Sequence, residues 1–234
     1  MIRLIFHGHA FLEITTDNFS LLIDPFVQEN PKADVTLEQV IGFSKLKYIA
    51  LTHGHDDHLG DTPAIAKARP EVKVIATFEL AQYLQIVQWL TNVHFMHIGG
   101  KFDFGDFVLK YVPAIHGGGI ADLKNGFTTV AWGIVVQIGD KKIYHAGDTA
   151  LTMDMKLLEP HQIDVAFLPI GDNSTMGIDD AVRAVEFIKP KIVVPIHYNT
   201  WPLIQADEEE FARKVMLGGI AKPKILRPGE ELPL

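Results

Sequence analysis

The chain of 234 residues contains no cysteine. This absence excludes disulfide bonds, thiolate metal ligands and a cysteine nucleophile. No apolar run approaches the roughly 20 residues that a helix needs to cross a bilayer. The first residues lack the long apolar core and the small-residue cleavage site of a signal peptide. We therefore expect a cytoplasmic protein without a membrane partner.

Clusters of basic side chains are also absent from the sequence. The formal net charge is −8, and the densest basic stretches are single pairs such as Lys141-Lys142. Proteins that bind polymeric nucleic acid need grouped Lys and Arg side chains that displace counterions from phosphates. We therefore expect a small-molecule substrate and no nucleic-acid partner. The sequence leaves open whether the protein is a homo-oligomer.

Predicted strands and helices alternate along the chain, as in an α/β protein. The strands are β-branched or aromatic runs bounded by Gly, Asp or Pro, and the helices show apolar residues at helical spacing. No linker or low-complexity tract interrupts them, so we expect a single domain over residues 1–234. The strands are expected at 3–7, 11–15, 20–24, 48–52, 72–76, 107–112, 128–138, 142–146, 165–169 and 192–196. The helices are expected at 36–41, 63–68, 79–90, 153–158, 179–188 and 208–217.

The order of these elements repeats weakly. A hairpin is predicted over residues 11–24 and a second one over residues 134–146. Each hairpin is followed by a helical stretch and then by an apolar strand, at 48–52 and at 165–169. This pattern predicts two similar halves that pack sheet to sheet.

The densest group of ligand-type side chains is the run 53–58, which reads His-Gly-His-Asp-Asp-His. Neutral imidazole and carboxylate groups are ligands of zinc, manganese and iron. In an extended or loop backbone, alternate side chains point the same way. His53 and His55 can then bind one ion, while Asp57 and His58 reach a second. The run therefore predicts part of a metal site, whose remaining ligands must come from elsewhere.

Three further ligand-type residues follow other predicted strands. His116 comes after the strand at 107–112, Asp148 after that at 142–146, and His197 after that at 192–196. Site residues of sheet-based α/β enzymes gather in loops at one end of the strands. We therefore expect these side chains to lie near the run 53–58.

These motifs, in this order, resemble the metallo-β-lactamase superfamily. The resemblance implies an α/β fold, a four-layer αβ/βα sandwich with two mixed β-sheets face to face and helices outside. It also implies a binuclear metal centre, in which His53, His55 and His116 hold the first ion. In the same way, Asp57, His58 and His197 would hold the second ion, and Asp148 would bridge both.

A narrower resemblance concerns Gly8-His9-Ala10-Phe11, Asp24-Pro25 and the stretch 168–172. These residues are similar to a branch of small, uncharacterised metal-dependent hydrolases related to the ascorbate-6-phosphate lactonases. The common form of the first motif has Ser where this chain has Ala10. A role that depends on a hydroxyl group at this position is therefore not expected.

The ligand set predicts a metal-dependent hydrolase that attacks a small-molecule ester, lactone or phosphoester with an activated water. Zinc is the first choice for the two divalent ions, while manganese, nickel and iron stay open. Asp57 and His145 are the candidate catalytic residues, with His9 as a further candidate. Asp24, Asp56 and Asp172 are candidates for holding metal-bound imidazoles by hydrogen bonds.

Several alternatives stay open. His145 and His9 can each be an ordinary buried histidine, and Gly117–Phe127 is either a lid or a loop that approaches the metals. The protein as a whole can be a di-iron redox protein or a non-catalytic metal-binding protein of the same fold. Relatives that bind di-iron typically have Glu at the position of His55 and a fused flavin domain. A colourless zinc or manganese protein would favour hydrolysis.

Overall fold

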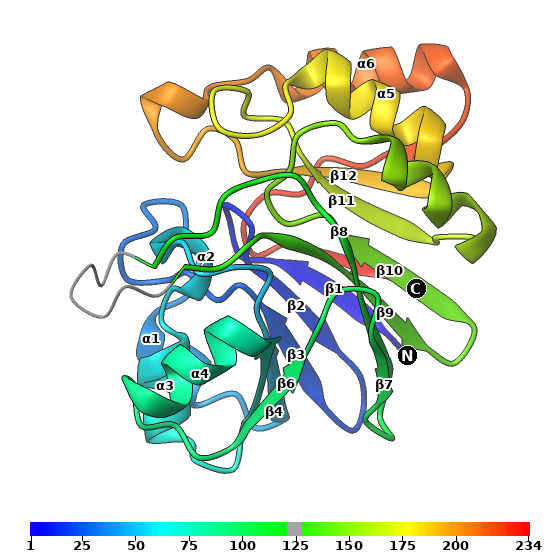
Figure 1. The fold of residues 1–234 in the computed structure, drawn as a ribbon. Helices are drawn as coiled ribbons and strands as arrows, with labels where there is room; N and C mark the ends of the chain where they lie inside the picture. Colours follow the sequence, from blue (N-terminus) through cyan, green and yellow to red (C-terminus); the bar gives the residue numbers. More distant parts are fainter. Residues whose placement is uncertain (121–127) are drawn as a thin grey trace. The chain divides into compact units, whose positions relative to one another are not determined.

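The computed structural model describes residues 1–120 and 128–234. The chain divides into two compact units. Unit 1 comprises Met1–His97, Gly117–Val130 and Arg227–Leu234, and unit 2 comprises Ile98–His116 and Ala131–Leu226. Each unit contains one 7-stranded mixed sheet with its own helices (Figure 1). The expectation that residues 1–234 form a single domain stays a prediction.

In unit 1 an antiparallel part of the sheet continues into a parallel part. The strand order is β14-β1-β2-β3-β4-β5-β6, with antiparallel pairing from β14 to β3 and parallel pairing from β3 to β6. The parallel strands are linked by helical crossovers, as parallel pairing requires. The strands are β1 (Arg3–Phe6), β2 (Leu12–Thr15), β3 (Ser20–Ile23), β4 (Leu46–Ala50), β5 (Lys73–Thr77), β6 (Val93–Met96) and β14 (Glu231–Pro233).

The sheet of unit 2 follows the same plan. Its order is β13-β12-β11-β10-β9-β8-β7, with antiparallel pairing from β7 to β10 and parallel pairing from β10 to β13. The shared plan confirms the similarity of the two halves that the two hairpins predicted. The strands are β7 (Lys101–Asp103), β8 (Val108–Pro113), β9 (Trp132–Ile138), β10 (Lys141–His145), β11 (Val165–Pro169), β12 (Ile192–Ile196) and β13 (Lys222–Pro223).

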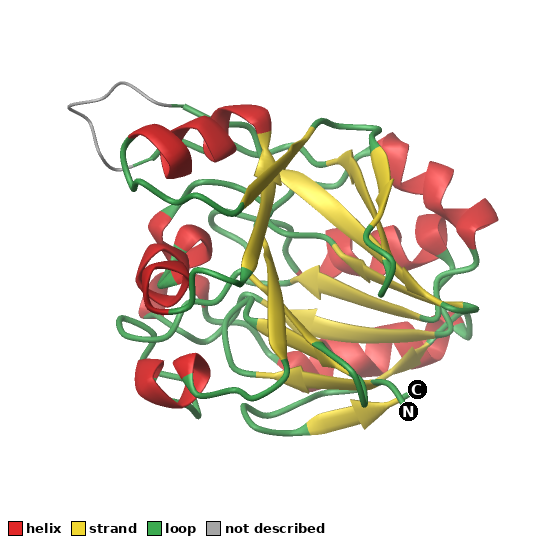
Figure 2. Ribbon diagram, turned by 90° about the horizontal axis from the view of Figure 1, so that it is seen from below, coloured by secondary structure: helices red, strands yellow, loops and turns green. Residues whose placement is uncertain are grey.

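Helices bury an apolar stripe against each sheet (Figure 2). In unit 1, Ile65 and Leu84 from two helices share a core cluster with Ile49 and Val74 from the strands. In unit 2, Val185 and Phe211 share a core cluster with strand residues in the same way. The helices are α1 (Leu37–Ile41), α2 (Asp56–Leu59), α3 (Thr62–Ala68) and α4 (Phe78–Ile86) in unit 1, and α5 (Ile178–Ile188), α6 (Glu208–Gly218) and the 3₁₀ helices η1 (Met153–His161) and η2 (Pro202–Ile204) in unit 2.

The helix predicted at 79–90 is shorter in the structure, because α4 ends at Ile86 and Trp89 adopts a φ of 60°. The strand predicted at 128–138 begins only at Trp132. The short α2 was not predicted at all. No helix in the described ranges is long and apolar enough to cross a bilayer.

Candidate metal centre

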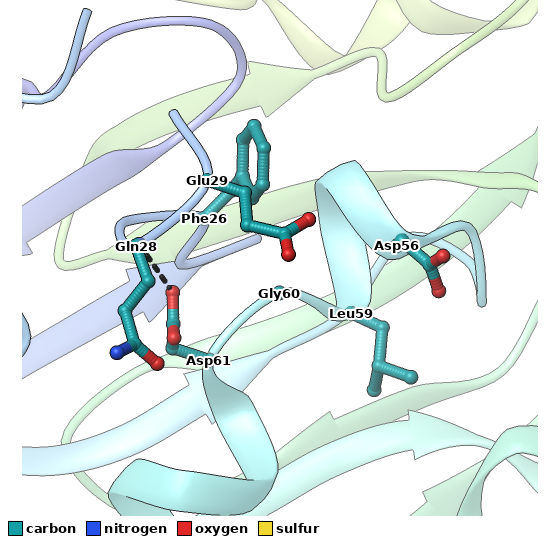
Figure 3. Close-up of a pocket in the computed structure, with 7 residues that line it drawn as sticks. All are labelled: Phe26, Gln28, Glu29, Asp56, Leu59, Gly60 and Asp61. Atoms are coloured by element: carbon teal, nitrogen blue, oxygen red, sulfur yellow. Dashed lines mark hydrogen bonds between the residues drawn. The ribbon is translucent and has the colours of Figure 1, made fainter. Parts of the chain in front are cut away.

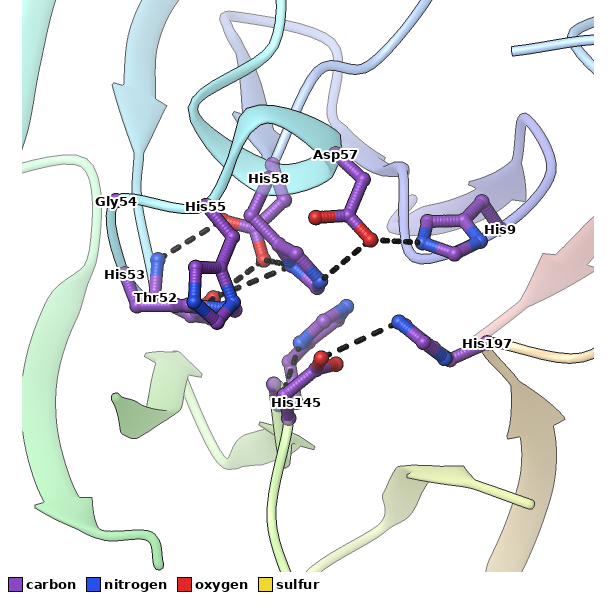
Figure 4. A network of polar contacts seen from close by, with 12 residues as sticks. His9, Thr52, His53, Gly54, His55, Asp57, His58, His145 and His197 are labelled. Atoms are coloured by element: carbon purple, nitrogen blue, oxygen red, sulfur yellow. Dashed lines mark hydrogen bonds and ion pairs between the residues drawn. The ribbon is translucent and has the colours of Figure 1, made fainter. Parts of the chain in front are cut away.

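The run 53–58 begins just after β4 in unit 1. Its first residues are extended or bent, but Asp56 starts α2, so Asp57 and His58 lie in the first turn of a short helix. This corrects the expectation of an extended or loop backbone over the whole run. The helix turns the carboxylate of Asp57 and the imidazole of His58 toward one another (Figure 4).

The ligand-type atoms of unit 1 have separations that suit metal binding. His53 Nε2 lies 3.0 Å from His55 Nδ1, and His58 Nε2 lies 4.0 Å from Asp57 Oδ2. Two atoms bonded to the same ion at about 2.1 Å lie roughly 3 to 4 Å apart. The donor types and their spacing therefore fit a divalent cation.

A buried network fixes which ring nitrogens carry hydrogen. Asp24 is fully buried, and its Oδ2 lies 2.7 Å from His58 Nδ1 and 2.6 Å from the hydroxyl of Thr52. Because a carboxylate only accepts, both groups donate to it. The Thr52 hydroxyl then accepts from His53 Nδ1, at 3.0 Å. In the neutral rings, the Nε2 atoms of His53 and His58 are then without hydrogen, as metal ligation requires.

Close backbone approach explains a glycine inside the run. A Cβ atom on Gly54 would lie 2.7 Å from a side-chain carbon of Ile120. The Gly54 N–H donates to the hydroxyl of Thr129 at 3.2 Å, and this hydroxyl also donates to the Gly118 carbonyl. Gly118 itself has no room for a side chain beside Thr129. These contacts favour a loop that closely approaches the run 53–58, while the rest of the predicted lid, residues 121–127, lies outside the described residues.

In unit 2 a single carboxylate lies between two imidazoles. Asp148 Oδ2 is 3.5 Å from His116 Nε2 and 3.2 Å from His197 Nε2. Asp148 and His197 are buried, and His116 is half-buried. The side chains come from the ends of three strands, β8, β10 and β12. The structure thus brings together the three predicted ligands of this unit.

Thr149 connects the loops that carry two of these ligands. The N–H of Ile115, next to His116, donates to the Thr149 hydroxyl at 3.0 Å, and the N–H of Ala150 donates to the carbonyl of Ile115. On the other side of the site, a Cβ atom at Gly171 would lie 2.3 Å from the carbonyl oxygen of His197. The backbone around Asp148 is therefore tied to the segment that carries His116, and the backbone of Gly171 closely approaches that of His197.

His145 is fully buried at the end of β10 and stacks on Phe167, with ring centroids 6.2 Å apart. Its Nδ1 accepts the N–H of Gly147 at 3.1 Å. The neutral ring therefore carries its hydrogen on Nε2. A neutral imidazole with its hydrogen on Nε2 can donate a hydrogen bond to an oxygen atom of a substrate.

Of the three predicted supporting carboxylates, Asp24 contacts a ligand as described above. Asp56 is exposed at the start of α2. It lines a hollow of about 390 Å³ with Phe26, Glu29 and Asp61 among others (Figure 3). Asp172 packs against Gly177 and bonds through its backbone to Met176 in a turn of unit 2. Asp24 is therefore the supporting carboxylate of the run 53–58.

Sequence reasoning missed the roles of Thr52 and Thr149. Both threonines directly neighbour a predicted ligand, His53 in one case and Asp148 in the other. A hydroxyl residue next to a predicted ligand is a signal for such a role, but this signal is too common in sequences to select these two threonines. Only the folded chain brings these hydroxyls to the segments that they join.

Comparisons with known proteins agree with this geometry. A family model described as a β-lactamase superfamily domain matches residues 20–198. A UPF0173 metal-dependent hydrolase of Staphylococcus aureus (strain MRSA252) is 46% identical over 98% of this chain and 99% of its own length.

Among solved structures, Igni18, a metallo hydrolase from Ignicoccus hospitalis, is 32% identical, with a TM-score of 0.87 over 99% of this chain and 97% of that chain. A putative metal-dependent hydrolase from Parabacteroides distasonis is 26% identical, with a TM-score of 0.73 over 98% of this chain and 94% of that chain. These likenesses confirm the α/β metallo-β-lactamase fold predicted from the sequence. The chain therefore belongs to the β-lactamase superfamily and, within it, to the UPF0173 family of metal-dependent hydrolases.

Proposed function

We propose that this hydrolase works with two divalent ions, with zinc as the first choice, and cleaves a small-molecule ester, lactone or phosphoester. The donor set supports the choice of metal, because imidazole with carboxylate and no thiolate suits zinc, and also manganese, nickel or iron. The proposed ligands are His53, His55 and His116 for the first ion, Asp57, His58 and His197 for the second, and Asp148 for both.

The observation that carries this proposal is the position of Asp148. One oxygen of its carboxylate lies close both to His116, a proposed ligand of the first ion, and to His197, a proposed ligand of the second. A buried carboxylate between two imidazoles is the arrangement that a bridging ligand needs. The neutral tautomers of His53 and His58, fixed through Thr52 and Asp24, support the proposal from unit 1.

When bound, the ions would supply Lewis acidity and lower the pKa of a shared water toward about 7. The chain itself would supply orientation and a hydrogen-bond donor. We assign to Asp57 the acceptance of a hydrogen bond from the attacking water, which directs a lone pair of the water at the substrate. We assign to His145 a hydrogen bond from its neutral Nε2–H to the oxygen of the leaving group, which would stabilise the negative charge that develops there; the proton that the released oxygen takes up would come from the attacking water.

The substrate class is supported by charge as well as by chemistry. A net charge of −8 without grouped basic residues argues for a small substrate over a nucleic acid. Lactone or phosphodiester substrates, and the kinship with ascorbate-6-phosphate lactonases, belong to this proposal. Location in the cytoplasm stays a prediction, and the sequence leaves the oligomeric state open.

The test is elemental analysis of the purified protein followed by an esterase, lactonase and phosphodiesterase panel. We expect two equivalents of a divalent metal and turnover that is lost on chelation and restored by zinc or manganese. Asp148→Ala should lose both metal and turnover, whereas Asp56→Ala, the matched exposed carboxylate, should keep both. Undiminished turnover in fully stripped protein would contradict the proposal. An iron charge-transfer band would favour the di-iron redox alternative instead.

A further inference from the structure

His9 lies in a strained turn, and this turn determines the direction in which its imidazole points. The turn is closed by hydrogen bonds from His7 N–H to the Phe11 carbonyl and from Phe11 N–H to the Gly8 carbonyl, at 2.9 and 3.0 Å. His9 has a φ of 58°, in the left-handed region that residues with a side chain rarely adopt. Such strain gathers at functional sites, where the surrounding structure maintains it.

Gly8 makes this turn feasible. Its φ is 96°, and a Cβ atom there would lie 2.9 Å from the carbonyl oxygen of Lys32. Only glycine fits such a position without strain or displacement. The Gly8-His9 pair thus places an imidazole where an ordinary turn would not place one.

The imidazole of His9 is buried and points at the run 53–58 (Figure 4). Its ring lies edge-on to that of Phe26, with centroids 5.7 Å apart. Its Nε2 lies 3.1 Å from Asp57 Oδ2. Because a carboxylate oxygen accepts and does not donate, His9 donates its Nε2–H to Asp57.

Asp57 needs such a partner more than His58, the other proposed ligand on α2, does. Its side chain is 25% exposed, whereas those of His9 and His58 are 0% exposed. It also lies on a helix of 4 residues, which restrains its backbone less than a long helix would. The oxygen that His9 contacts is the one that faces His58 Nε2 at 4.0 Å.

We propose that His9 is a positioning residue that holds the Asp57 carboxylate in the orientation needed to bind the second ion. This inference rests on the proposed function, because it assigns Asp57 to that ion. Partners that hydrogen-bond to a metal ligand typically change metal affinity by about 10- to 100-fold. His9 would therefore control how firmly the second ion is held and leave the first ion largely unaffected.

Two substitutions separate hydrogen bonding from packing. His9→Phe keeps a ring of similar size against Phe26 and removes the donor. His9→Gln places an amide N–H near the position of Nε2 and restores the donor. Binding of zinc is measured by competition with a chromophoric chelator, and d–d absorption is recorded after loading with Co²⁺. Circular dichroism and the thermal midpoint check that both variants fold.

We expect His9→Phe to lower the affinity for the second ion by about 10- to 100-fold. The affinity for the first ion should stay within about threefold of that of the unaltered protein. We expect His9→Gln to recover most of the affinity for the second ion, with the Co²⁺ spectrum of the unaltered protein. Nitrogen-15 correlation spectra of metal-stripped protein should show hydrogen on His9 Nε2. These results would support the positioning role.

Equal binding of both ions by His9→Phe and the unaltered protein would overturn the inference. It would also be overturned if both variants lost the second ion and the Co²⁺ bands changed as on removal of a ligand, because His9 would then bind the ion directly. The uptake of metal by the unaltered protein is measured separately. If the unaltered protein does not take up two ions, the result contradicts the proposed function and not the role of His9.

Discussion

His58 and Asp24 form a fully buried pair, with Nδ1 and Oδ2 only 2.7 Å apart. The same Asp24 oxygen accepts from Thr52, whose hydroxyl in turn accepts from His53. One carboxylate thus sets the tautomers of two imidazoles. Asp24 stands at a φ of 50°, so the backbone is itself strained to place it there.

Replacing Asp24 tests this control of the tautomers. Asp24→Asn is nearly isosteric but places an N–H₂ group or a weaker acceptor opposite His58 and Thr52. We expect zinc affinity to fall by about 10- to 100-fold, because the orientation and basicity of the imidazoles are lost. The measurement is competition with a chelator. Asp56→Asn is the control, and equal affinity in the two variants would refute the role of Asp24.

Thr149→Val removes the hydroxyl that accepts from Ile115 and keeps the shape of the side chain. We expect the free energy of unfolding to fall by about 1 kcal/mol, together with a severalfold loss of metal affinity as the loop of Asp148 loosens. Thr149→Ser should restore both. Chemical denaturation and metal titration measure the two effects. A Thr149→Val protein with unchanged unfolding free energy and unchanged metal affinity would show that the hydroxyl is dispensable.

His145→Asn keeps an acceptor near the Gly147 N–H and removes the Nε2–H. We expect kcat to fall by about 10²- to 10³-fold, the usual contribution of a hydrogen-bond donor to a developing oxyanion. Metal content should not change, because His145 is not a proposed ligand. Steady-state kinetics with elemental analysis on the same samples make the comparison. Undiminished turnover by the variant would mean that His145 is an ordinary buried histidine without a part in the reaction.

The buried His7 predicts a pH dependence of stability. Burial lowers the pKa of His7, but hydrogen bonds and charges from Asp34 and Glu13 outweigh burial and raise the pKa above 6.5. A raised pKa in the folded state means that protonation favours folding. This contribution is complete below about pH 6.5, the ordinary pKa of histidine, and is lost as the pH rises through the folded-state pKa.

His7→Asn keeps a donor toward Asp34 but does not titrate. We expect the difference in unfolding free energy between the unaltered protein and this variant to shrink as the pH rises above 6.5. Denaturant unfolding of metal-free samples at several pH values measures this difference. A difference that is constant or grows with pH would mean that His7 is not the titrating group.

The sequence predicted the parts of the fold that have strong local patterns. The hairpin of β2 and β3 and the strand β11 are recognisable because β-branched and apolar residues fill them between turn signals. The strands β6, β7, β13 and β14 were missed. They have 2 to 4 residues and are partly polar, so neighbouring strands and not their own composition determine them.

The candidate site residues stand out in the sequence, because their side-chain types are rare and, in the run 53–58, closely spaced; their role as metal ligands stays a prediction. The structure groups His53, His55, Asp57 and His58 in unit 1, and His116, Asp148 and His197 in unit 2. Asp24 and His9 could be named as candidates from the sequence, but neither could be paired with its partner, and the role of Thr52 was missed. Thr52 to Asp24 spans 28 residues and His9 to Asp57 spans 48, so only the folded chain brings them together.

Anomalous diffraction at the metal absorption edge from crystals of the purified protein tests the central claim most directly. We predict two peaks, one within bonding distance of His53, His55 and His116 and the other within bonding distance of Asp57, His58 and His197, with Asp148 touching both. A single peak, or ions held by other side chains, would contradict the account.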